Sequence, residues 1–140
     1  MVTVSSKVLM SSPVKIVEEK KFKVLSMYLR EDGIMNTIFE DNILITINDV
    51  IEALHWVESL GDKKYLNLFE GGYNTDFDVV VREYASSAEE NKHTIADAIV
   101  ATTSSLNMVA NFYVKFNKPH MPTKVFNEKE EAIKWLLSFK

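Results

Sequence analysis

Residues 118–137, with the sequence KPHMPTKVFNEKEEAIKWLL, decide the fold because they predict a strand that leads into an amphipathic helix. The strand is expected at Thr123–Phe126. Asn127 is a good helix N-cap residue, and Glu130, three positions later, can complete a capping box. We expect the helix to pack on a sheet that contains the strand before it. The apolar residues that form its packing face recur at helical spacing and are Ala132, Ile133, Trp135, Leu136 and Phe139.

The N-terminal half of the chain predicts a β-hairpin. Residues 22–30 and 34–39 have the composition of strands. Residues 31–33, Glu-Asp-Gly, lie between them and form a turn sequence. Residues 43–46 fit either a third short strand or the segment that leads into the next helix.

Helices and strands alternate after the hairpin. Thr46 with Asp49 predicts the start of a helix that ends at Gly61. The sequence therefore predicts an α/β domain with a mixed sheet, in which an N-terminal antiparallel hairpin is followed by βα units. We expect residues 1–20 to form an arm or an edge strand, and residues 21–140 to form a single domain. The later elements are expected as a strand over 64–70, a helix over 76–84, a strand over 95–101 and a helix over 106–116.

Size and charge disfavour several classes of protein. A chain of 140 residues has the length of one ordinary domain. Its net charge of −4, from 16 basic and 20 acidic residues, disfavours nucleic-acid binding, which needs a basic stripe. The lack of cysteine excludes disulfides and thiolate zinc sites. We find no apolar run long enough for a membrane span and no signal-peptide pattern, so we expect a cytoplasmic protein.

Few residues indicate catalysis or metal binding. The chain has no cysteine nucleophile and no Gly-x-Ser-x-Gly motif. His55, His93 and His120 do not form a HExxH-type pair. We therefore predict no catalytic residue, no metal site and no cofactor. An acid–base pair made of Asp97 and His93 is the one enzymatic alternative that we retain.

Two loops are the candidate sites for a ligand or a partner. The first follows the strand over 64–70 and contains two glycines, and the second combines hydroxyl groups with the amides of a helix N-terminus, which can hold an anion. A tight turn and ordinary helix capping are the structural alternatives for the same residues. Both loops should emerge at one end of the sheet, and a cavity between them would indicate a ligand site. The candidate residues are Gly71, Gly72, Tyr73 and Thr75 in the first loop and Thr103, Ser104 and Ser105 in the second.

Asp97 interrupts the apolar strand over 95–101. A buried carboxylate must find hydrogen-bond donors, pair with a cation such as Arg82, or raise its pKa. A structural ion pair or a position at the strand end is the simplest interpretation of this residue, and a functional carboxylate is the alternative.

The C-terminal two thirds of the chain resemble an uncharacterised bacterial family of STAS-like domains. This family is similar to the antagonists of sporulation anti-sigma factors (SpoIIAA-like) and, more distantly, to the SEC14-type lipid carriers. Residues 32–34, Asp-Gly-Ile, agree more weakly with the same pattern. The resemblance rests on residues 81–85 (VREYA), 95–100 (IADAIV), 110–113 (ANFY), 118–119 (KP), 122–126 (PTKVF) and 131–136 (EAIKWL).

The resemblance implies a non-enzymatic module that binds a protein partner or a small ligand. STAS antagonists are switched by phosphorylation of a Ser or Thr in an Asp-Ser-type loop, and Thr75 is the hydroxyl residue nearest to that place. The Asp-Ser motif itself is absent from residues 70–76. Our leading hypothesis is association with an unknown protein partner, or a homodimer formed through the hairpin edge or an exposed helix face. The alternative is a carrier of a small apolar ligand or lipid in a SEC14-like pocket.

Overall fold

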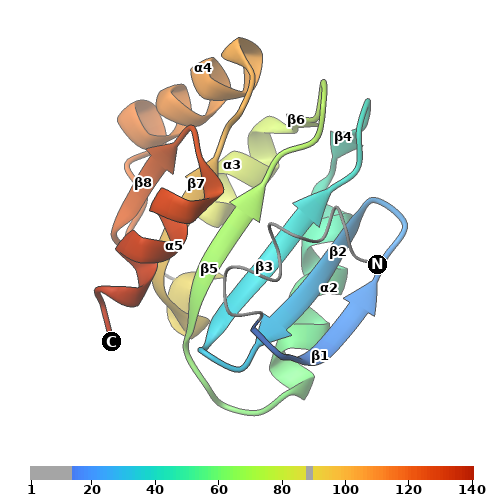
Figure 1. The fold of residues 1–140 in the computed structure, drawn as a ribbon. Coiled ribbons are helices and arrows are strands. Elements are labelled where there is room, and N and C mark those ends of the chain that lie inside the picture. Colours follow the sequence, from blue (N-terminus) through green and yellow to red (C-terminus); the bar gives the residue numbers. More distant parts are fainter. Residues whose placement is uncertain (1–13, 88–89) are drawn as a thin grey trace, which may run out of the picture.

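The computed structural model describes residues 14–87 and 90–140. It is an α/β domain built around a six-stranded mixed sheet with the strand order β1-β2-β3-β5-β7-β8 (Figure 1). The strands of this sheet are β1 (Ile16–Lys21), β2 (Leu25–Arg30), β3 (Ile34–Phe39), β5 (Tyr65–Glu70), β7 (Thr94–Val100) and β8 (Thr123–Phe126). A separate two-stranded sheet pairs β4 (Leu44–Ile45) with β6 (Asp76–Phe77). The helices are α2 (Ile47–Ser59), α3 (Val79–Ala85), the 3-10 helix η1 (Glu90–His93), α4 (Ser104–Phe112), the π-helical turn η2 (Tyr113–Asn117) and α5 (Lys129–Leu137).

The main sheet is antiparallel in its first half and parallel in its second. β1, β2 and β3 form antiparallel pairs, with Met27 opposite Thr37 in the β2–β3 hairpin. β3, β5, β7 and β8 run parallel to one another. The parallel strands therefore end at the same edge of the sheet, and the loops that follow them lie at that edge.

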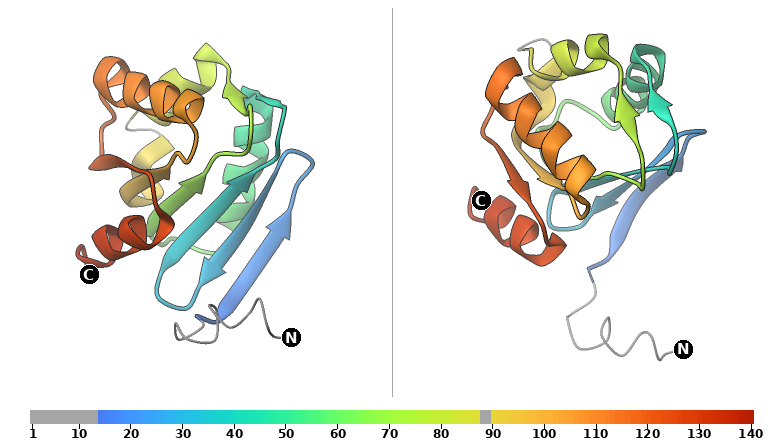
Figure 2. Two further views of the ribbon diagram at one scale, coloured as in Figure 1. Left: turned by 45° about the horizontal axis from the view of Figure 1, so that its top comes forward. Right: turned by 90° about the horizontal axis from the view of Figure 1, so that it is seen from above.

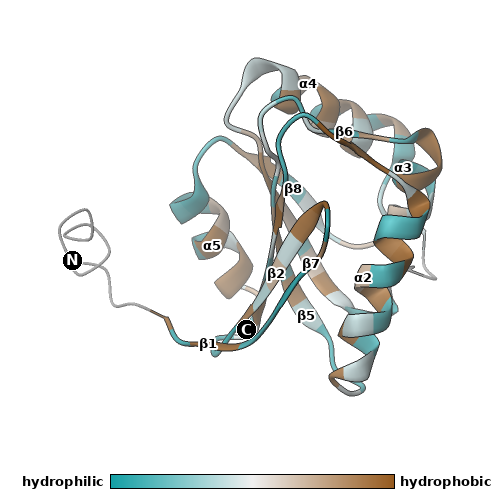
Figure 3. Cartoon of the chain, turned by 90° about the vertical axis from the view of Figure 1, so that its right-hand side faces the viewer, coloured by the Kyte–Doolittle hydropathy of each residue, from teal (hydrophilic) through white to brown (hydrophobic). Residues whose placement is uncertain are grey.

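The helices are divided between the two faces of the main sheet. Helices α2, α3 and α4 cover one face and α5 covers the other (Figures 2 and 3). Coloured by hydropathy, α2 turns its apolar side toward the strands (Figure 3). The central strands β5 and β7 are therefore covered on both faces, which explains their nearly continuous apolar sequences.

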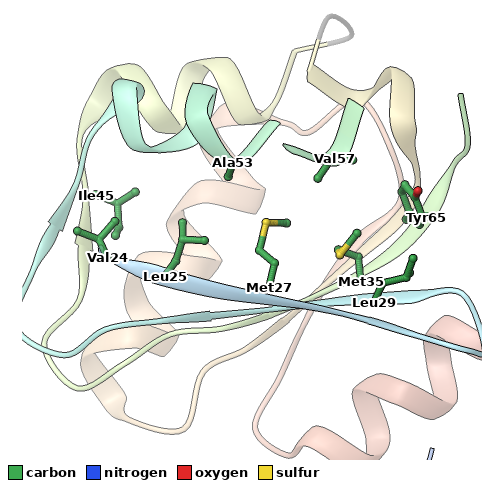
Figure 4. Packing of buried hydrophobic residues seen from close by; sticks show 9 residues of the cluster. All are labelled: Val24, Leu25, Met27, Leu29, Met35, Ile45, Ala53, Val57 and Tyr65. Carbon is green, nitrogen blue, oxygen red and sulfur yellow. The ribbon is translucent and has the colours of Figure 1, made fainter. Parts of the chain in front are cut away.

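The core beneath α2 is formed by aliphatic residues of the hairpin. Figure 4 shows Ala53 and Val57 of α2 pointing toward Leu25, Met27 and Met35 of β2 and β3. These five residues are all buried. Removing this apolar surface from water is the main force that fixes α2 on the sheet.

The core beneath α5 confirms that the C-terminal helix packs on the sheet. Ala132 and Leu136 are fully buried against β5 and β7, where they meet Leu68 and Ala98. Trp135 lies beside Phe126 of β8, with 5.7 Å between the ring centroids. The predicted strand–helix unit is therefore present.

The N-cap predicted for this helix is wrong. The capping position is Glu128, one residue later than expected, and its side chain makes no capping hydrogen bond. Asn127 is used elsewhere, because its Oδ1 accepts a hydrogen bond from Nδ2 of Asn107 at 2.9 Å. The side chain of Asn127 thus bonds to a residue on α4 that is distant in the sequence and does not cap α5.

Two predicted element boundaries are also wrong. The helix expected from residue 76 begins at Val79, because the backbone N–H groups of Asp76 and Asp78 donate to the carbonyls of Ile43 and Ile45 and hold β6 against β4. The strand expected over residues 22–30 begins at Leu25, because residues 22–24 form the turn between β1 and β2.

Other local predictions are confirmed. The turn between β2 and β3 contains Gly33, whose φ of +89° lies in the left-handed region that favours glycine. The carboxylate of Asp49 accepts from the backbone N–H of Thr46 at 2.9 Å, which caps α2 as expected. The predicted α/β class with an N-terminal antiparallel hairpin is correct. Within the expected arm or edge strand over residues 1–20, β1 is an edge strand, and residues 1–13 lie outside the described residues.

Replacing Leu136 with alanine tests the packing of α5. We expect Leu136→Ala to lower the free energy of unfolding by about 2–5 kcal/mol, because it leaves a cavity in a fully buried site. Chemical denaturation measures the change. Lys134→Ala, at an exposed position of the same helix, is the control and should change stability by less than about 0.5 kcal/mol. Equal effects of the two substitutions would contradict the packing of this helix.

Candidate functional site

The two candidate loops lie next to each other at the carboxyl edge of the sheet. β5 and β7 are parallel neighbours, so the loops that follow them emerge together. Gly71 touches the start of α4 so closely that a Cβ added to it would lie 2.9 Å from a side-chain carbon of Leu106. The two loops were expected at one end of the sheet, and the geometry agrees.

Gly72 is required by a close approach of two backbones. A Cβ at this position would lie 2.8 Å from the carbonyl oxygens of Phe39, the last residue of β3, and of Glu40, which follows it. The next residue, Tyr73, donates its backbone N–H to Asp41 at 2.7 Å and exposes 68% of its surface. The glycine pair thus has a packing role.

Thr75 is buried in the same loop. Its hydroxyl donates to the carbonyl of Glu40 at 2.6 Å and accepts from the backbone N–H of Gly72 at 3.0 Å. Only 4% of the residue is exposed. A kinase would have to open this loop to reach the hydroxyl, so the phosphosite stays a prediction that the geometry does not favour.

The second loop caps α4. The hydroxyl of Thr103 accepts from the backbone N–H of Leu106 at 3.2 Å, which is an ordinary N-cap contact. Ser104 and Ser105 are exposed on the first turn of the helix. Neither of these serines lines the cavity described next.

A largely apolar cavity of about 160 Å³ lies between the main sheet and helices α3 and α4. It is partly open to solvent. Among the candidate loop residues, only Gly71 contributes to its wall. The other lining residues are Phe39, Ile45, Val50, Phe69, Phe77, Val81, Arg82, Ala85, Asp97, Ile99, Val100, Ala101, Leu106, Val109, Ala110 and Tyr113.

Asp97 is the acidic residue in the wall of this cavity. It lies in the middle of β7 and is 7% exposed. Its Oδ1 accepts a hydrogen bond from Nδ2 of Asn67 on β5 at 2.9 Å. Burial raises the pKa of Asp97 from 3.8 to about 6, and the hydrogen bond from Asn67 opposes this change.

Arg82 does not pair with Asp97, so the ion pair expected between them is not formed. The guanidinium of Arg82 lies over the ring of Phe112, 6.0 Å from its centroid. This cation–π contact joins α3 to the end of α4. Arg82 therefore lines the cavity without neutralising the carboxylate.

A second cavity of about 90 Å³ lies under α2 and has a more polar wall. Two buried hydroxyls in its wall, those of Thr37 and Tyr65, have no hydrogen-bond partner among the residues that the structure describes. His93 also lines it, with Nδ1 3.2 Å from the carbonyl of Lys63. Burial raises the pKa of Tyr65, and the nearby Glu18 adds to this effect.

The structure does not join Asp97 and His93 into an acid–base pair. Nε2 of His93 lies 3.6 Å from the carboxylate of Glu58, whereas Asp97 is held by Asn67. Within residues 14–87 and 90–140, no group of three or more His, Asp or Glu side chains is placed to hold a metal ion. No helix in this part of the chain has the length and apolarity needed to cross a membrane.

An exposed apolar stripe runs along α4 into η2. It consists of Met108, Phe112 and Phe116, which are spaced four residues apart and are each at least half exposed. The rings of Phe112 and Phe116 stack with 4.3 Å between their centroids. We call these three residues the α4 stripe.

Residues 27–140 match the family model of a domain of unknown function, DUF7793. The chain belongs to the DUF7793 family. The match begins within β2 and covers the rest of the sheet, both candidate loops and every residue that lines the larger cavity. No curated protein matches the sequence.

A solved structure shows which fold the DUF7793 domain adopts. An uncharacterised protein of the DUF3478 family from Shewanella loihica PV-4, described as having a SpoIIAA-like fold, superposes with a TM-score of 0.51 at 12% identity. The superposition covers 88% of this chain and 93% of that one. A protein of unknown function from Arthrobacter sp. FB24 gives a TM-score of 0.26 at 21% identity, over 79% and 96% of the two chains. The first comparison confirms the SpoIIAA-like, STAS-like fold.

Sequence reasoning found part of the cavity of the DUF7793 domain. It singled out Asp97 as an anomaly and Gly71 as a loop residue, and both line the cavity. It did not identify the individual wall residues on α3 and α4, such as Val109, because apolar residues at helical spacing look like ordinary core positions. The clearest signal of the cavity in the sequence was the acidic residue Asp97 within an apolar strand.

Asp97→Asn tests the effect of burial on the carboxylate. Because the folded pKa of about 6 exceeds the ordinary value of 3.8, the folded wild type binds the proton more tightly than the unfolded chain does. Wild-type stability should therefore rise as the pH falls from 7 to 4, by at most about 3 kcal/mol from this group. The asparagine variant should lack that rise. Denaturant unfolding at several pH values measures it.

Asp62→Asn is the matched control, since Asp62 is exposed. This variant should follow the pH profile of the wild type. If Asp97→Asn keeps the wild-type profile as well, the assigned protonation of Asp97 is wrong.

Proposed function

We propose that this chain is a non-enzymatic STAS-like binding domain that holds a small apolar ligand in the cavity between the main sheet and helices α3 and α4. The observation that carries the proposal is the cavity itself, with about 160 Å³ of space behind a mainly aliphatic and aromatic wall. Well-packed domains contain few voids larger than a water molecule. A mainly apolar space with a few polar groups in its wall is typical of a ligand site.

The volume limits the class of ligand. An engineered apolar cavity of about 150 Å³ in another protein binds benzene, so this cavity suits a single aromatic ring or a short branched chain. Drug-sized ligands usually occupy pockets of about 300–1,000 Å³. A long acyl chain would not fit, and the SEC14-like alternative therefore takes the form of a small-molecule site.

The position of the cavity also supports the proposal. It lies beside the carboxyl ends of the parallel strands β5 and β7, where open α/β sheets tend to bind ligands. Its wall combines the rigid sheet, through Phe69 and Ile99, with the short helix α3. One side of the cavity is thus formed by the rigid sheet, and the other side by separate helices.

A cavity-filling substitution tests this function. Ala110 lies on α4, is 8% exposed and lines the cavity. We expect Ala110→Leu to lower the affinity for toluene at least about tenfold, because the larger side chain occupies the space. Perturbation of the methyl resonances of Ile99 and Leu106 during an NMR titration measures the binding.

Asn111→Leu, at the exposed neighbouring position, is the control and should bind toluene as the wild type does. Thermal unfolding measurements on both variants check that each of them is folded. If the wild type shows no saturable shift of the cavity methyl groups with toluene or with an amine-bearing analogue of it, the apolar-ligand function is contradicted.

Protein association is the second candidate function, and the α4 stripe favours it. Met108 is 74% exposed and Phe116 is 60% exposed, which is unusual for two large apolar side chains on one helix face. Phe112 stacks on Phe116 and extends the same surface. A homodimer or another protein partner would remove this surface from water.

Replacing both stripe phenylalanines with serine tests this second function. We expect the wild type to sediment with a concentration-dependent mass and the Phe112→Ser/Phe116→Ser variant to stay monomeric. Ile51→Ser, which changes an exposed apolar residue on α2, is the control and should keep the wild-type behaviour. Two results together would contradict association through the stripe. The wild type would be monomeric at all concentrations, and affinity purification would recover no protein with the wild type that is missing with the double variant.

A further inference from the structure

One carboxylate oxygen of Asp97 has no protein partner. Oδ1 accepts from Nδ2 of Asn67, and no described group donates to Oδ2. The amide of Asn67 also contacts Oγ1 of Thr94 at 3.1 Å, so it is already shared between two acceptors. Asp97 is more than nine-tenths buried and belongs to the wall of the larger cavity.

Oδ2 is not one of the fully enclosed polar atoms that lack a hydrogen-bond partner, so it stays in contact with the space of the cavity. Removing a charged oxygen from water without a donor destabilises the folded protein, and a paired cation or a strong hydrogen-bond donor offsets that effect. Most side chains that share the cavity wall with Asp97, such as Ile99 and Val109, are apolar, and in the described part of the chain no hydrogen bond joins Asp97 to the polar wall residues Arg82 and Tyr113. What would satisfy Oδ2 is therefore a donor on a molecule in the cavity.

Arg82 does not supply this donor. Its guanidinium lies over Phe112 on α4, and it forms no ion pair with Asp97. The carboxylate of Asp97 is the one acidic group among the residues that line the cavity, and it forms no ion pair within residues 14–87 and 90–140. A positively charged donor on a ligand would provide both the charge and the hydrogen bond that Asp97 lacks.

We propose that the cavity selects a small apolar molecule that carries a primary amine, with its apolar body against α3 and α4 and its ammonium donating to Oδ2 of Asp97. This inference rests on the proposed ligand-binding function and names the chemistry of the ligand. The apolar wall supplies affinity and the single carboxylate fixes the orientation, as in most small-molecule sites. The ammonium can take the place of a water molecule at Oδ2 with little loss of affinity, because its N–H groups donate the hydrogen bond that the water would have donated.

Binding of such an amine depends on pH. Asp97 is hydrogen-bonded to the neutral Asn67 on β5, the polar residues that share the cavity wall with it are Arg82 on α3 and Tyr113 on η2, and the wall residues contributed by α2 and α4 are apolar. Because the pKa of Asp97 is about 6, the carboxylate is ionised at pH 8 and mostly neutral at pH 5. The affinity for a cationic amine should therefore fall about tenfold between pH 8 and pH 5.

Benzylamine and toluene form a matched pair of probes for the test. They share the aromatic ring, and benzylamine adds an amine that stays cationic from pH 5 to pH 8. NMR titrations of the full chain at pH 8 should give benzylamine at least tenfold higher affinity than toluene. Asp97→Asn should abolish that preference, and the exposed control Asp62→Asn should retain it.

The outcomes separate this inference from the function on which it rests. If toluene binds as tightly as benzylamine, or if the preference for benzylamine survives in Asp97→Asn, the amine inference is overturned and the apolar-ligand function stands. If neither probe shifts the cavity methyl groups, both are overturned. The wild-type titration at pH 5 and pH 8 needs no variant, so an affinity for benzylamine that does not change with pH overturns the amine inference even if Asp97→Asn fails to fold.

Discussion

The double coverage of β5 and β7 is the constraint on which the rest of the structure depends. α5 buries one face of these strands through Ala132 and Leu136, and α3 and α4 lie over the other. Both faces are then expected to be mainly apolar, and a polar side chain on them needs hydrogen-bond partners. Asp97 lies on the face toward α3 and α4, and its surroundings explain both its raised pKa and the character of the cavity.

The two faces differ in how completely they are packed. Beneath α5, Leu68, Ala98 and Leu136 are each completely buried. On the opposite face, small side chains such as Ala101 and Ala110 leave space between the sheet and α4. The asymmetry places the cavity beside the carboxyl ends of the parallel strands, where the backbone contact at Gly72 ties the loops after β3 and β5 together.

The sequence predicted the fold well because its main signals are local. Strand composition, the turn at Gly33 and the cap at Thr46 need no knowledge of distant residues. The errors arose where distant groups intervene, as when Asn107 takes the oxygen of Asn127, or when the backbone carbonyl of Ile43 draws Asp76 into a strand. The full wall of the cavity could not be predicted, since it combines residues from nine elements and the loops between them, and each of its apolar residues alone looks like core.

The free edge strand β1 has a consequence for assembly. Its six residues, IVEEKK, are all exposed, and the register with β2 shifts between Ile16 and Glu18. Consecutive charges and a bulge on an open edge oppose pairing with a strand of another molecule. At the opposite edge, β8 has only four residues. These features of both edges disfavour growth of the sheet by addition of strands from other copies of the chain.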